Sequence, residues 1–384
     1  MNYFSSNFKL GILGGGQLGK MLLYTTRKFD VYTSVLDPSA EAPCKIACDE
    51  FHKGDLMDFE TVYNFGKNVD VLTFEIEHVN VDALQKLEDE GVQVYPSSKT
   101  LQTIQNKGIQ KLFYQKHNIP TAPFSIYMSL EELMHSVENE VISIPFVWKS
   151  TQFGYDGTGV KVVRTLADLE NLPNVECMCE ELVDFKNELA VIVARNVSGD
   201  VKTYPVVEME FHPEANQVEY VICPARISEE IQAKAKKVAL QVSEALDHTG
   251  ILAVELFQTQ NDEILVNEVA PRPHNSGHYS IEASYTDQFE QHIRAILNLP
   301  LGNTASKVAG IMVNLVGAEG HTGDVVYENI EKIMQLEGVT PHIYGKKQTR
   351  PFRKMGHVTI VNEDVAEARK VAEEVKQTIN VISK

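Results

Sequence analysis

The sequence predicts an α/β protein of more than one domain, with a parallel sheet in its N-terminal part. Two observations support this prediction. Apolar segments of strand length alternate with amphipathic segments of helix length over residues 8–95, which is the pattern of a parallel sheet with crossover helices. The second observation is length, because 384 residues exceed what one hydrophobic core usually organises and predict two or three domains.

Composition indicates a soluble enzyme. Hydrophobic residues make up 43% of the chain, and 35 basic against 53 acidic residues give a net charge of −18, which argues against nucleic acid as a partner. No apolar run approaches the roughly 18 residues that span a bilayer, so we expect no membrane association. The first residues, Met1 to Lys9, lack the regions of a signal peptide. We therefore expect a cytoplasmic location.

The cysteines do not predict a metal site. Neither the C-x₃-C spacing nor the C-x-C spacing is accompanied by a matching second pair. We expect reduced thiols, mostly in the core, at all five positions, which are Cys44, Cys48, Cys177, Cys179 and Cys223.

The N-terminal domain is expected to comprise residues 1–104. A strand at Phe8–Leu13 precedes a helix that ends at about Lys28 and a second strand at Val31–Leu36. Further helices at 56–67 and 81–90 alternate with strands at 69–75 and 92–95, which completes a parallel sheet.

A glycine-rich turn, Gly14-Gly15-Gly16-Gln17-Leu18-Gly19, joins the first strand to the first helix. It matches the dinucleotide pattern G-x-G-x-x-G, and Asp37 lies near the distance expected for a ribose ligand. The same geometry offers backbone amides to any phosphate, so it favours an anion site more strongly than NAD. A tight turn without a ligand stays a third interpretation.

Glu75 is a candidate site residue because it ends a predicted strand of this sheet, at the edge where open α/β sheets bind ligands. The alternative is a solvated acid at a strand end.

The central region, residues 105–300, contains a possible mobile flap within about 120–185. A helical stretch at 97–117 and a stiff linker at 118–123 lead to a strand at Pro145–Lys149 and another at Val160–Val163. Between these strands, Gly154-Tyr155-Asp156-Gly157-Thr158-Gly159 carries three glycines and could lay backbone amides over phosphates. An acidic strand, Glu176–Val183, follows.

A hairpin with two opposed glutamates follows the helix predicted at 228–246. Strands at Ile251–Gln258 and Glu263–Val269 flank a two-residue turn, which places Glu255 opposite Glu268. Opposed carboxylates destabilise a strand pair unless a cation lies between them, and Mg²⁺ is the natural candidate. A hairpin whose charged face meets solvent is the alternative. The polar run from Arg272 to His278 favours a site.

The C-terminal domain is expected at residues 301–384. Its predicted elements are strands at 309–315, 339–344 and 357–361 and helices at 325–336 and 366–379. Arg350, Arg353 and Lys354 place three cations in five residues of an acidic protein, which predicts an anion site or, alternatively, a solvated basic loop.

The order of these motifs resembles the ATP-grasp enzymes over essentially the whole chain. More narrowly, GGGQLG, TFEIEHV, GYDGTG, EELV, NEVAPRPHNSGH and RKMGH resemble the N5-carboxyaminoimidazole ribonucleotide synthetase family of purine biosynthesis. The resemblance implies an N-terminal Rossmann-like domain, a central ATP-grasp region and a small C-terminal domain. It also implies ATP and Mg²⁺ as cofactors, 5-aminoimidazole ribonucleotide and bicarbonate as substrates, and a homodimer.

Site residues follow from the same resemblance. ATP would contact Lys107, Lys149, Gly154, Tyr155, Asp156, Gly157, Thr158, Gly159, Val160, Glu180, Glu181, Leu182, Val183, Glu188, His212, Asn267 and Glu268. Mg²⁺ would be held by Glu255 and Glu268. The ribonucleotide would contact Gly16, Gln17, Leu18, Glu75, Tyr155, Asp156, Arg272, His274, Asn275, Ser276, Arg353 and Lys354, with catalytic roles for Glu75, Asp156 and Lys354.

Two positions depart from the related patterns. Thr158 stands where many relatives carry Arg or Lys, and Ala270 stands where the wider superfamily tends to place Asn. Metal ligation would then depend on two carboxylates, phosphate oxygens and water.

Three other functions stay open at this point. An NAD-dependent oxidoreductase would use the glycine turn and leave the carboxylate pair unexplained. A nucleotide-binding sensor without catalysis would leave the C-terminal anion site unexplained. Another ATP-grasp ligase or carboxylase would use every motif.

Overall fold

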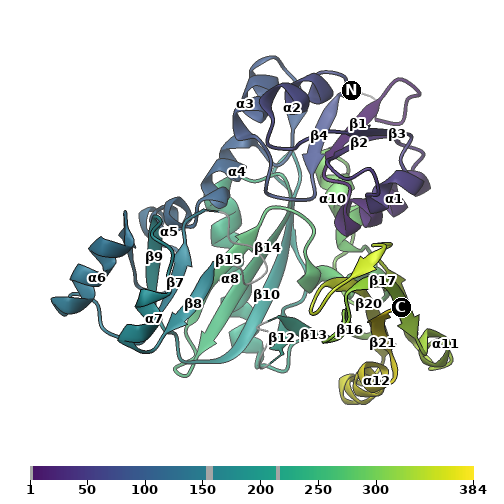
Figure 1. The fold of residues 1–384 in the computed structure, drawn as a ribbon. Coiled ribbons are helices and arrows are strands. Elements are labelled where there is room, and N and C mark those ends of the chain that lie inside the picture. The colour runs from purple at the N-terminus through teal and green to yellow at the C-terminus, as the bar shows by residue number, and fades with distance from the viewer. Residues whose placement is uncertain (1–2, 153–158, 213–216) are drawn as a thin grey trace.

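Three parts meet around the centre of the molecule. The computed structural model describes residues 3–152, 159–212 and 217–384. Figure 1 shows the N-terminal sheet at the top, a small sheet flanked by helices at the left, and the C-terminal strands at the lower right. In the described part of the chain, no helix combines the length and apolar character needed to cross a bilayer.

The N-terminal part is the predicted parallel sheet with crossover helices, and this prediction is confirmed. Its strand order is β3-β2-β1-β4-β5, with the central strand β1 contributing fully buried Leu10, Ile12 and Leu13. Leu13 is paired with Phe74, so the glycine turn and Glu75 leave the same edge side by side. The bounds are β1 (Lys9–Leu13), α1 (Gln17–Lys28), β2 (Tyr32–Asp37), η1 (Pro43–Ile46), β3 (Glu50–Lys53), α2 (Phe59–Gly66), β4 (Val71–Phe74), α3 (Val81–Asp89) and β5 (Gln93–Val94).

The second part is a small antiparallel sheet with the order β6-β9-β7-β8. The helical stretch before it is interrupted at Asn106, which has an extended backbone and accepts a hydrogen bond from Ile109 N as the cap of a new helix. The bounds are α4 (Ser98–Gln105), α5 (Lys107–Lys116), β6 (Phe124–Tyr127), α6 (Leu130–Glu138), β7 (Phe146–Ser150), β8 (Val160–Val163), α7 (Leu166–Glu170) and β9 (Cys177–Glu181).

A large sheet joins the central and C-terminal regions. Its order is β15-β14-β10-β12-β13-β16-β20-β18, with β11 beside β10. The pairing of β13 with β16 carries the sheet across residue 300. Helix α8 packs Ala235, Ala239 and Val242 against one face. The bounds are β10 (Phe185–Arg195), β11 (Val201–Thr203), β12 (Val207–Phe211), β13 (Val218–Cys223), α8 (Glu229–Leu246), β14 (Gly250–Thr259), β15 (Ile264–Ala270), η2 (Asn275–Gly277), α9 (Ser280–Ala283), α10 (Gln288–Ile296), β16 (Ala309–Val316), β18 (Val339–Ile343) and β20 (Lys354–Asn362).

The helix predicted at Val325–Leu336 is wrong. The segment begins as a strand, β17 (Gly323–Glu328), which pairs with β19 (Gln348–Thr349) and β21 (Asn380–Ser383). Asn329 then adopts a left-handed backbone with φ 64°, and a single helical turn follows, α11 (Ile330–Ile333). The β-branched and aromatic residues Val325, Val326 and Tyr327 favour a strand, and the asparagine ends it. Helix α12 (Val365–Thr378) agrees with the predicted last helix.

The hairpin pairing is confirmed, although its predicted turn is wrong. Thr259 N donates to Glu263 O at 2.9 Å, and Asp262 has φ +63°, so three residues form the loop. Gln258 consequently pairs with Ile264. A bulge then leaves Asn267 as the extra residue on β15, and this shift restores Glu255 opposite Glu268.

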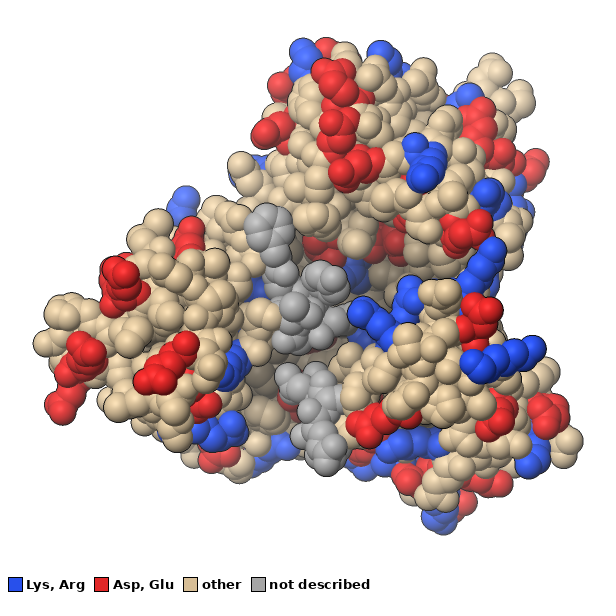
Figure 2. Space-filling view, in the orientation of Figure 1, with Lys and Arg blue, Asp and Glu red and all other residues tan. Residues whose placement is uncertain are grey.

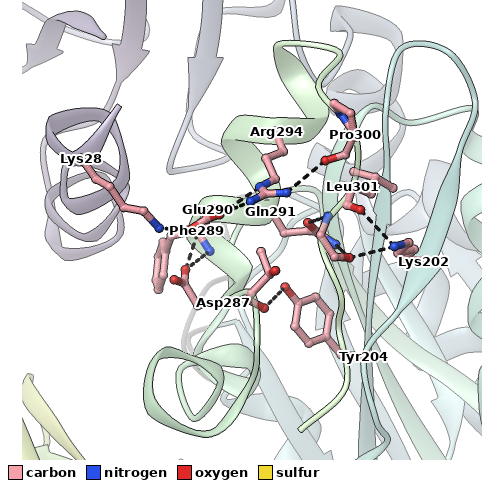
Figure 3. A network of polar contacts seen from close by, with 12 residues as sticks. Lys28, Lys202, Tyr204, Asp287, Phe289, Glu290, Gln291, Arg294, Pro300 and Leu301 are labelled. Carbon is pink, nitrogen blue, oxygen red and sulfur yellow. Dashed lines mark hydrogen bonds and ion pairs between the residues drawn. The ribbon is translucent and has the colours of Figure 1, made fainter. Parts of the chain in front are cut away.

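A polar network around α10 holds the N-terminal part against the large sheet (Figure 3). Glu290 forms an ion pair with Lys28 of α1 and another with Arg294, whose Nη2 lies 2.5 Å from Glu290 Oε1. Lys202 Nζ donates to the carbonyl oxygens of Leu301 and Gly302, both at 3.0 Å. The helix and the loop after it are therefore fixed to both neighbouring parts.

The cap of α10 yields a stability prediction. Asp287 Oδ1 accepts hydrogen bonds from Phe289 N at 2.8 Å and Glu290 N at 2.9 Å. Asp287→Ala should lower the free energy of unfolding by about 0.5–2 kcal/mol, because two amides at the helix start lose their acceptor. Asp287→Asn retains an acceptor and should lose less in the same urea titration. Equal losses in the two variants would contradict the capping role.

Candidate active site

Two opposed carboxylates form the floor of the site. Glu255 on β14 pairs with Glu268 on β15. Burial, together with the charge of Glu268, raises the pKa of Glu255 to about 7. His274 Nε2 lies 3.6 Å from Glu255 Oε1. The Glu268 side chain keeps 49% of its surface open to the cleft. The pair therefore combines an acid with a raised pKa and an accessible carboxylate.

Lysines reach this floor from the small-sheet side. Lys107 Nζ, at the start of α5, lies 2.5 Å from Glu268 Oε1. This ion pair outweighs the effect of burial and lowers the pKa of Glu268. Lys149 Nζ, on β7, lies 2.6 Å from Glu180 Oε2 and 3.2 Å from Asn267 Oδ1. Lys107 of α5 thus faces Glu268 of the large sheet, and Lys149 of the small sheet faces both Glu180 of its own sheet and Asn267 of the large one.

The segment expected to hold adenine connects the two sheets. Strand β9 ends at Glu181 and β10 begins at Phe185, with Leu182 40% exposed between them. Glu188 lies on the same face of the large sheet as Glu255, because Ala190, two residues on, pairs with Glu255. Burial and the charge of Glu255 raise the pKa of Glu188 to about 8. Residues 182–184 thus connect the two sheets, with Glu180 on β9 before them and Glu188 on β10 after them.

Carboxylates of the N-terminal part bind the amides of the glycine turn. Glu75 is buried and accepts hydrogen bonds from Gly16 N at 2.7 Å and Gly19 N at 2.9 Å. Asp37 accepts from Gly15 N at 2.7 Å. A Cβ at Gly16 would stand 2.6 Å from Glu75 Oε1, which explains the glycine there. Burial raises the pKa of Glu75, with these amides opposing the shift.

The polar run after β15 lies between the N-terminal strand end and the hairpin. Arg272 Nε lies 2.9 Å from Glu77 Oε1, and His274 Nδ1 lies 3.0 Å from Ser276 Oγ. Asn275 exchanges two hydrogen bonds of 2.9 Å with Asn314 of β16. The Asn275 side chain therefore ties the run to the C-terminal strands.

The C-terminal cations divide between two environments. Burial and the charge of Glu268 raise the pKa of Glu255, and the charge of Lys354, the first residue of β20, opposes this rise. Arg353 Nη1 instead donates to Gln348 O at 2.6 Å, within the C-terminal part. His212, expected at the nucleotide, has its ring centroid 6.0 Å from that of Phe352 beside this loop. Lys354 thus acts on the hairpin, whereas Arg353 binds within the C-terminal part.

Most of the expected flap lies outside the described residues, including Gly154, Tyr155, Asp156, Gly157 and Thr158. Its end is described. Gly159 has φ +81° and its carbonyl accepts from Ser150 N at 2.9 Å, while Val160 begins β8 opposite Lys149. Figure 2 shows a central hollow where the three parts meet, with basic side chains along its wall.

Comparisons with known proteins match the chain in three consecutive segments. Residues 8–105 match the ribonucleotide synthetase preATP-grasp domain, residues 112–289 the ATP-grasp domain, and residues 310–371 the phosphoribosylaminoimidazole carboxylase C-terminal domain. The N5-carboxyaminoimidazole ribonucleotide synthase of Bacillus subtilis is 38% identical over 92% of this chain and 91% of its own length. This chain belongs to the N5-carboxyaminoimidazole ribonucleotide synthase family. It is an ATP-grasp ligase, and the resemblance of its motifs is confirmed.

Solved structures agree with this assignment. The N5-carboxyaminoimidazole ribonucleotide synthetase of Thermotoga maritima has a TM-score of 0.90 at 43% identity, covering 98% of this chain and 100% of its own. The synthase of Aspergillus clavatus, in complex with ADP and 5-aminoimidazole ribonucleotide, has a TM-score of 0.88 at 33% identity, covering 97% and 98%. The ATP-grasp architecture predicted from the motifs is therefore confirmed.

Two charged residues that the structure places beside the predicted site residues were not among them. Lys111 is 2% exposed and lies 2.5 Å from Glu180, and Glu77 binds Arg272. A signal for Lys111 was present, because it follows Lys107 by four residues and shares its helix face. Glu77 stands two residues after Glu75 in the same motif.

Because Glu75 and Asp37 already bind amides of the glycine turn, we predict that the protein binds no nicotinamide dinucleotide. A dinucleotide pyrophosphate would have to displace Glu75 and Asp37 from the glycine turn, and both carboxylates would repel it. We expect calorimetry to detect no NAD(H) or NADP(H) binding up to roughly 1 mM, a Kd that corresponds to about −4 kcal/mol. Mg·ATP in the same preparation should bind clearly. Micromolar nicotinamide binding would contradict the ligase assignment.

Proposed function

We propose that this chain joins bicarbonate to the amine of 5-aminoimidazole ribonucleotide at the expense of ATP, forming N5-carboxyaminoimidazole ribonucleotide, ADP and phosphate. The observation that supports this proposal most directly is that three kinds of group meet at one junction. They are the carboxylate pair of Glu255 and Glu268, the lysines Lys107 and Lys149, and Lys354 of the C-terminal part. A phosphoryl-transfer site and a second anion site thereby share one cleft. The names of the relatives agree with this activity.

The nucleotide would lie between the two sheets. Lys107 and Lys149 supply positive charge for its phosphates, and both are held on the side of the small sheet that faces the hairpin. The connection from β9 to β10 offers backbone groups for adenine, and Glu188 stands on the next strand for the ribose. Asn267, at the bulge, already accepts a hydrogen bond from Lys149 and would stand beside the phosphates.

The opposed glutamates fit a magnesium ion. Burial and the charge of Glu268 raise the pKa of Glu255, and a divalent cation beside the pair would favour its ionised form. Among the described residues, no cluster of three or more His, Cys, Asp and Glu could hold a metal alone. Glu255 and Glu268 would therefore hold Mg²⁺ together with phosphate oxygens and water, as nucleotide enzymes do. When bound, the ion would neutralise charge on the transferred phosphoryl group.

The ribonucleotide would bind at the meeting point of the N-terminal edge and the C-terminal strands. Lys354 offers a cation for its phosphate, and the amides of Gln17 and Leu18 lie at the start of α1, where an anion is favoured. Glu75, Arg272 and His274 border the same edge. Glu75 holds Gly16 N, so a phosphate at that amide would have to displace this carboxylate.

The chemistry explains why these parts must meet. Bicarbonate is a poor electrophile, so an oxygen of bicarbonate first takes the γ-phosphoryl group of ATP, which gives carboxyphosphate and ADP. The ribonucleotide amine then attacks the carboxyl carbon and phosphate leaves. Asp156 would accept the amine proton. Because carboxyphosphate decomposes in water, the loop from Gly154 to Val160 would exclude solvent during the reaction.

The proposal also covers the oligomeric state, the location and the partners of the enzyme. It includes a homodimer in the cytoplasm that acts on small molecules, and the net charge of −18 argues against nucleic acid as a partner.

The direct test measures phosphate release from Mg·ATP. We expect the rate to rise at least tenfold only when 5-aminoimidazole ribonucleotide and bicarbonate are both present, with one carbamate formed per phosphate, because the carboxyphosphate must be captured by the amine. Aminoimidazole lacking the ribose phosphate serves as the matched control and should stimulate poorly. Release that is indifferent to the ribonucleotide would refute the proposed acceptor.

Lys354→Met should separate the two anion sites. Loss of a charge-assisted hydrogen bond costs about 1.5–3 kcal/mol, which corresponds to a roughly 10- to 150-fold loss in kcat/KM for the ribonucleotide. The KM for ATP should change little, because Lys107 and Lys149 remain. Glu268→Gln is the comparison variant and should lose turnover with every substrate combination. Equal weakening of ATP and ribonucleotide by Lys354→Met would place this lysine in the nucleotide site instead.

A further inference from the structure

Lys111 is a buried cation beneath the proposed nucleotide site. It lies on α5 one helical turn after Lys107, and its side chain is 2% exposed. Its Nζ lies 2.5 Å from Glu180 Oε1 and donates a hydrogen bond to Thr121 Oγ1. Thr121 Oγ1 in turn donates to Val266 O of β15 at 2.8 Å. The ammonium is thus held at the base of the cleft, away from its open side.

Glu180 is shared between two lysines. Its side chain is 5% exposed, with Lys111 at one carboxylate oxygen and Lys149 at the other, 2.6 Å away. The two cations outweigh the effect of burial and lower the pKa of Glu180. Burial lowers the pKa of Lys111 to about 8, so it remains mostly protonated at neutral pH. The three groups therefore form a charged triad with one more cation than anion.

Lys149 has a second partner across the cleft. Its Nζ contacts Asn267 of the large sheet at 3.2 Å, beside the carboxylate pair. A lysine that turns fully from Glu180 towards phosphates would leave a buried carboxylate with one partner fewer. Leaving a buried charge unpaired costs several kcal/mol. The cation that remains on Glu180 thus determines how easily Lys149 can move.

We propose that Lys111 is a positioning residue that holds the charge of Glu180 and so releases Lys149 for the nucleotide phosphates. The proposal rests on the proposed nucleotide site between the two sheets. Lys111 acts through Glu180 and Lys149 and does not touch the nucleotide. Without Lys111, the buried carboxylate would retain Lys149, and nucleotide affinity would fall while the proposed ribonucleotide site, at the N-terminal edge and the C-terminal strands, would be unaffected.

The test compares three variants by calorimetry with Mg·ATP and by the KM for each substrate. Lys111→Met should raise the Kd for Mg·ATP at least tenfold and leave the KM for the ribonucleotide within about twofold. Adding Glu180→Gln to Lys111→Met should give tighter Mg·ATP binding than Lys111→Met and the same Kd as Glu180→Gln alone, because no carboxylate remains to retain Lys149. Lys116→Met removes an exposed lysine from the same helix and should bind Mg·ATP like the unchanged protein.

Several outcomes would overturn the proposal. They are unchanged Mg·ATP affinity in Lys111→Met, equal weakening of both substrates, or a double variant no better than the single one. If Lys111→Met does not fold, the double variant is compared with Glu180→Gln alone, and equal Mg·ATP affinities are expected. A weaker double variant would indicate a direct role for Lys111. Failure of the unchanged protein to bind Mg·ATP would instead refute the nucleotide site itself.

Discussion

Two carboxylates that face each other on neighbouring strands of a hairpin determine how much positive charge the site needs. Glu255 and Glu268 would repel each other in any protein, and burial makes the repulsion more costly. Cations from separate elements offset this repulsion, with Lys107 supplied by α5 and Lys354 by β20. The convergence of three parts of the chain is therefore an electrostatic requirement of the hairpin as well as a means of bringing substrates together.

The parts that sequence predicted well are those that local pattern determines. In the N-terminal sheet, apolar strands and amphipathic helices alternate at regular intervals, so the strands β1, β2, β4 and β5 and the position of Glu75 at a strand end followed directly. The short edge strand β3, which is not apolar, was missed. The carboxylate pairing was also predicted, but through a turn that proved wrong. The three-residue loop shifts the register by one residue and the bulge at Asn267 shifts it back. No single-strand pattern reveals two compensating shifts.

The parts that sequence missed depend on contacts between distant segments. Val325 to Glu328 forms a strand because the C-terminal residues Asn380–Ser383 pair with it, and helical spacing alone could not exclude that partner. The amides of the glycine turn looked available, yet Glu75, 59 residues after Gly16, accepts hydrogen bonds from both Gly16 N and Gly19 N. The helix sequence alone does not show that Lys111 is buried, because its partner Glu180 lies on the distant strand β9. The motifs predicted the family and its candidate site residues. The ion pairs and hydrogen bonds of those residues depend on contacts between distant segments, which the motifs do not show.

The two anion sites are held by different kinds of interaction. From Glu255 on β14 to Lys354 on β20, the chain of neighbours β14-β10-β12-β13-β16-β20 is joined by backbone hydrogen bonds, so their separation is fixed by the sheet. The lysines of the small sheet reach the same hairpin through side chains, Lys107 to Glu268 and Lys149 to Asn267. Phosphates would compete for those same ammonium groups. At the proposed sites, nucleotide binding would therefore act on the adjustable side of the cleft, while the ribonucleotide phosphate would meet Lys354 at a position that the large sheet fixes relative to the hairpin.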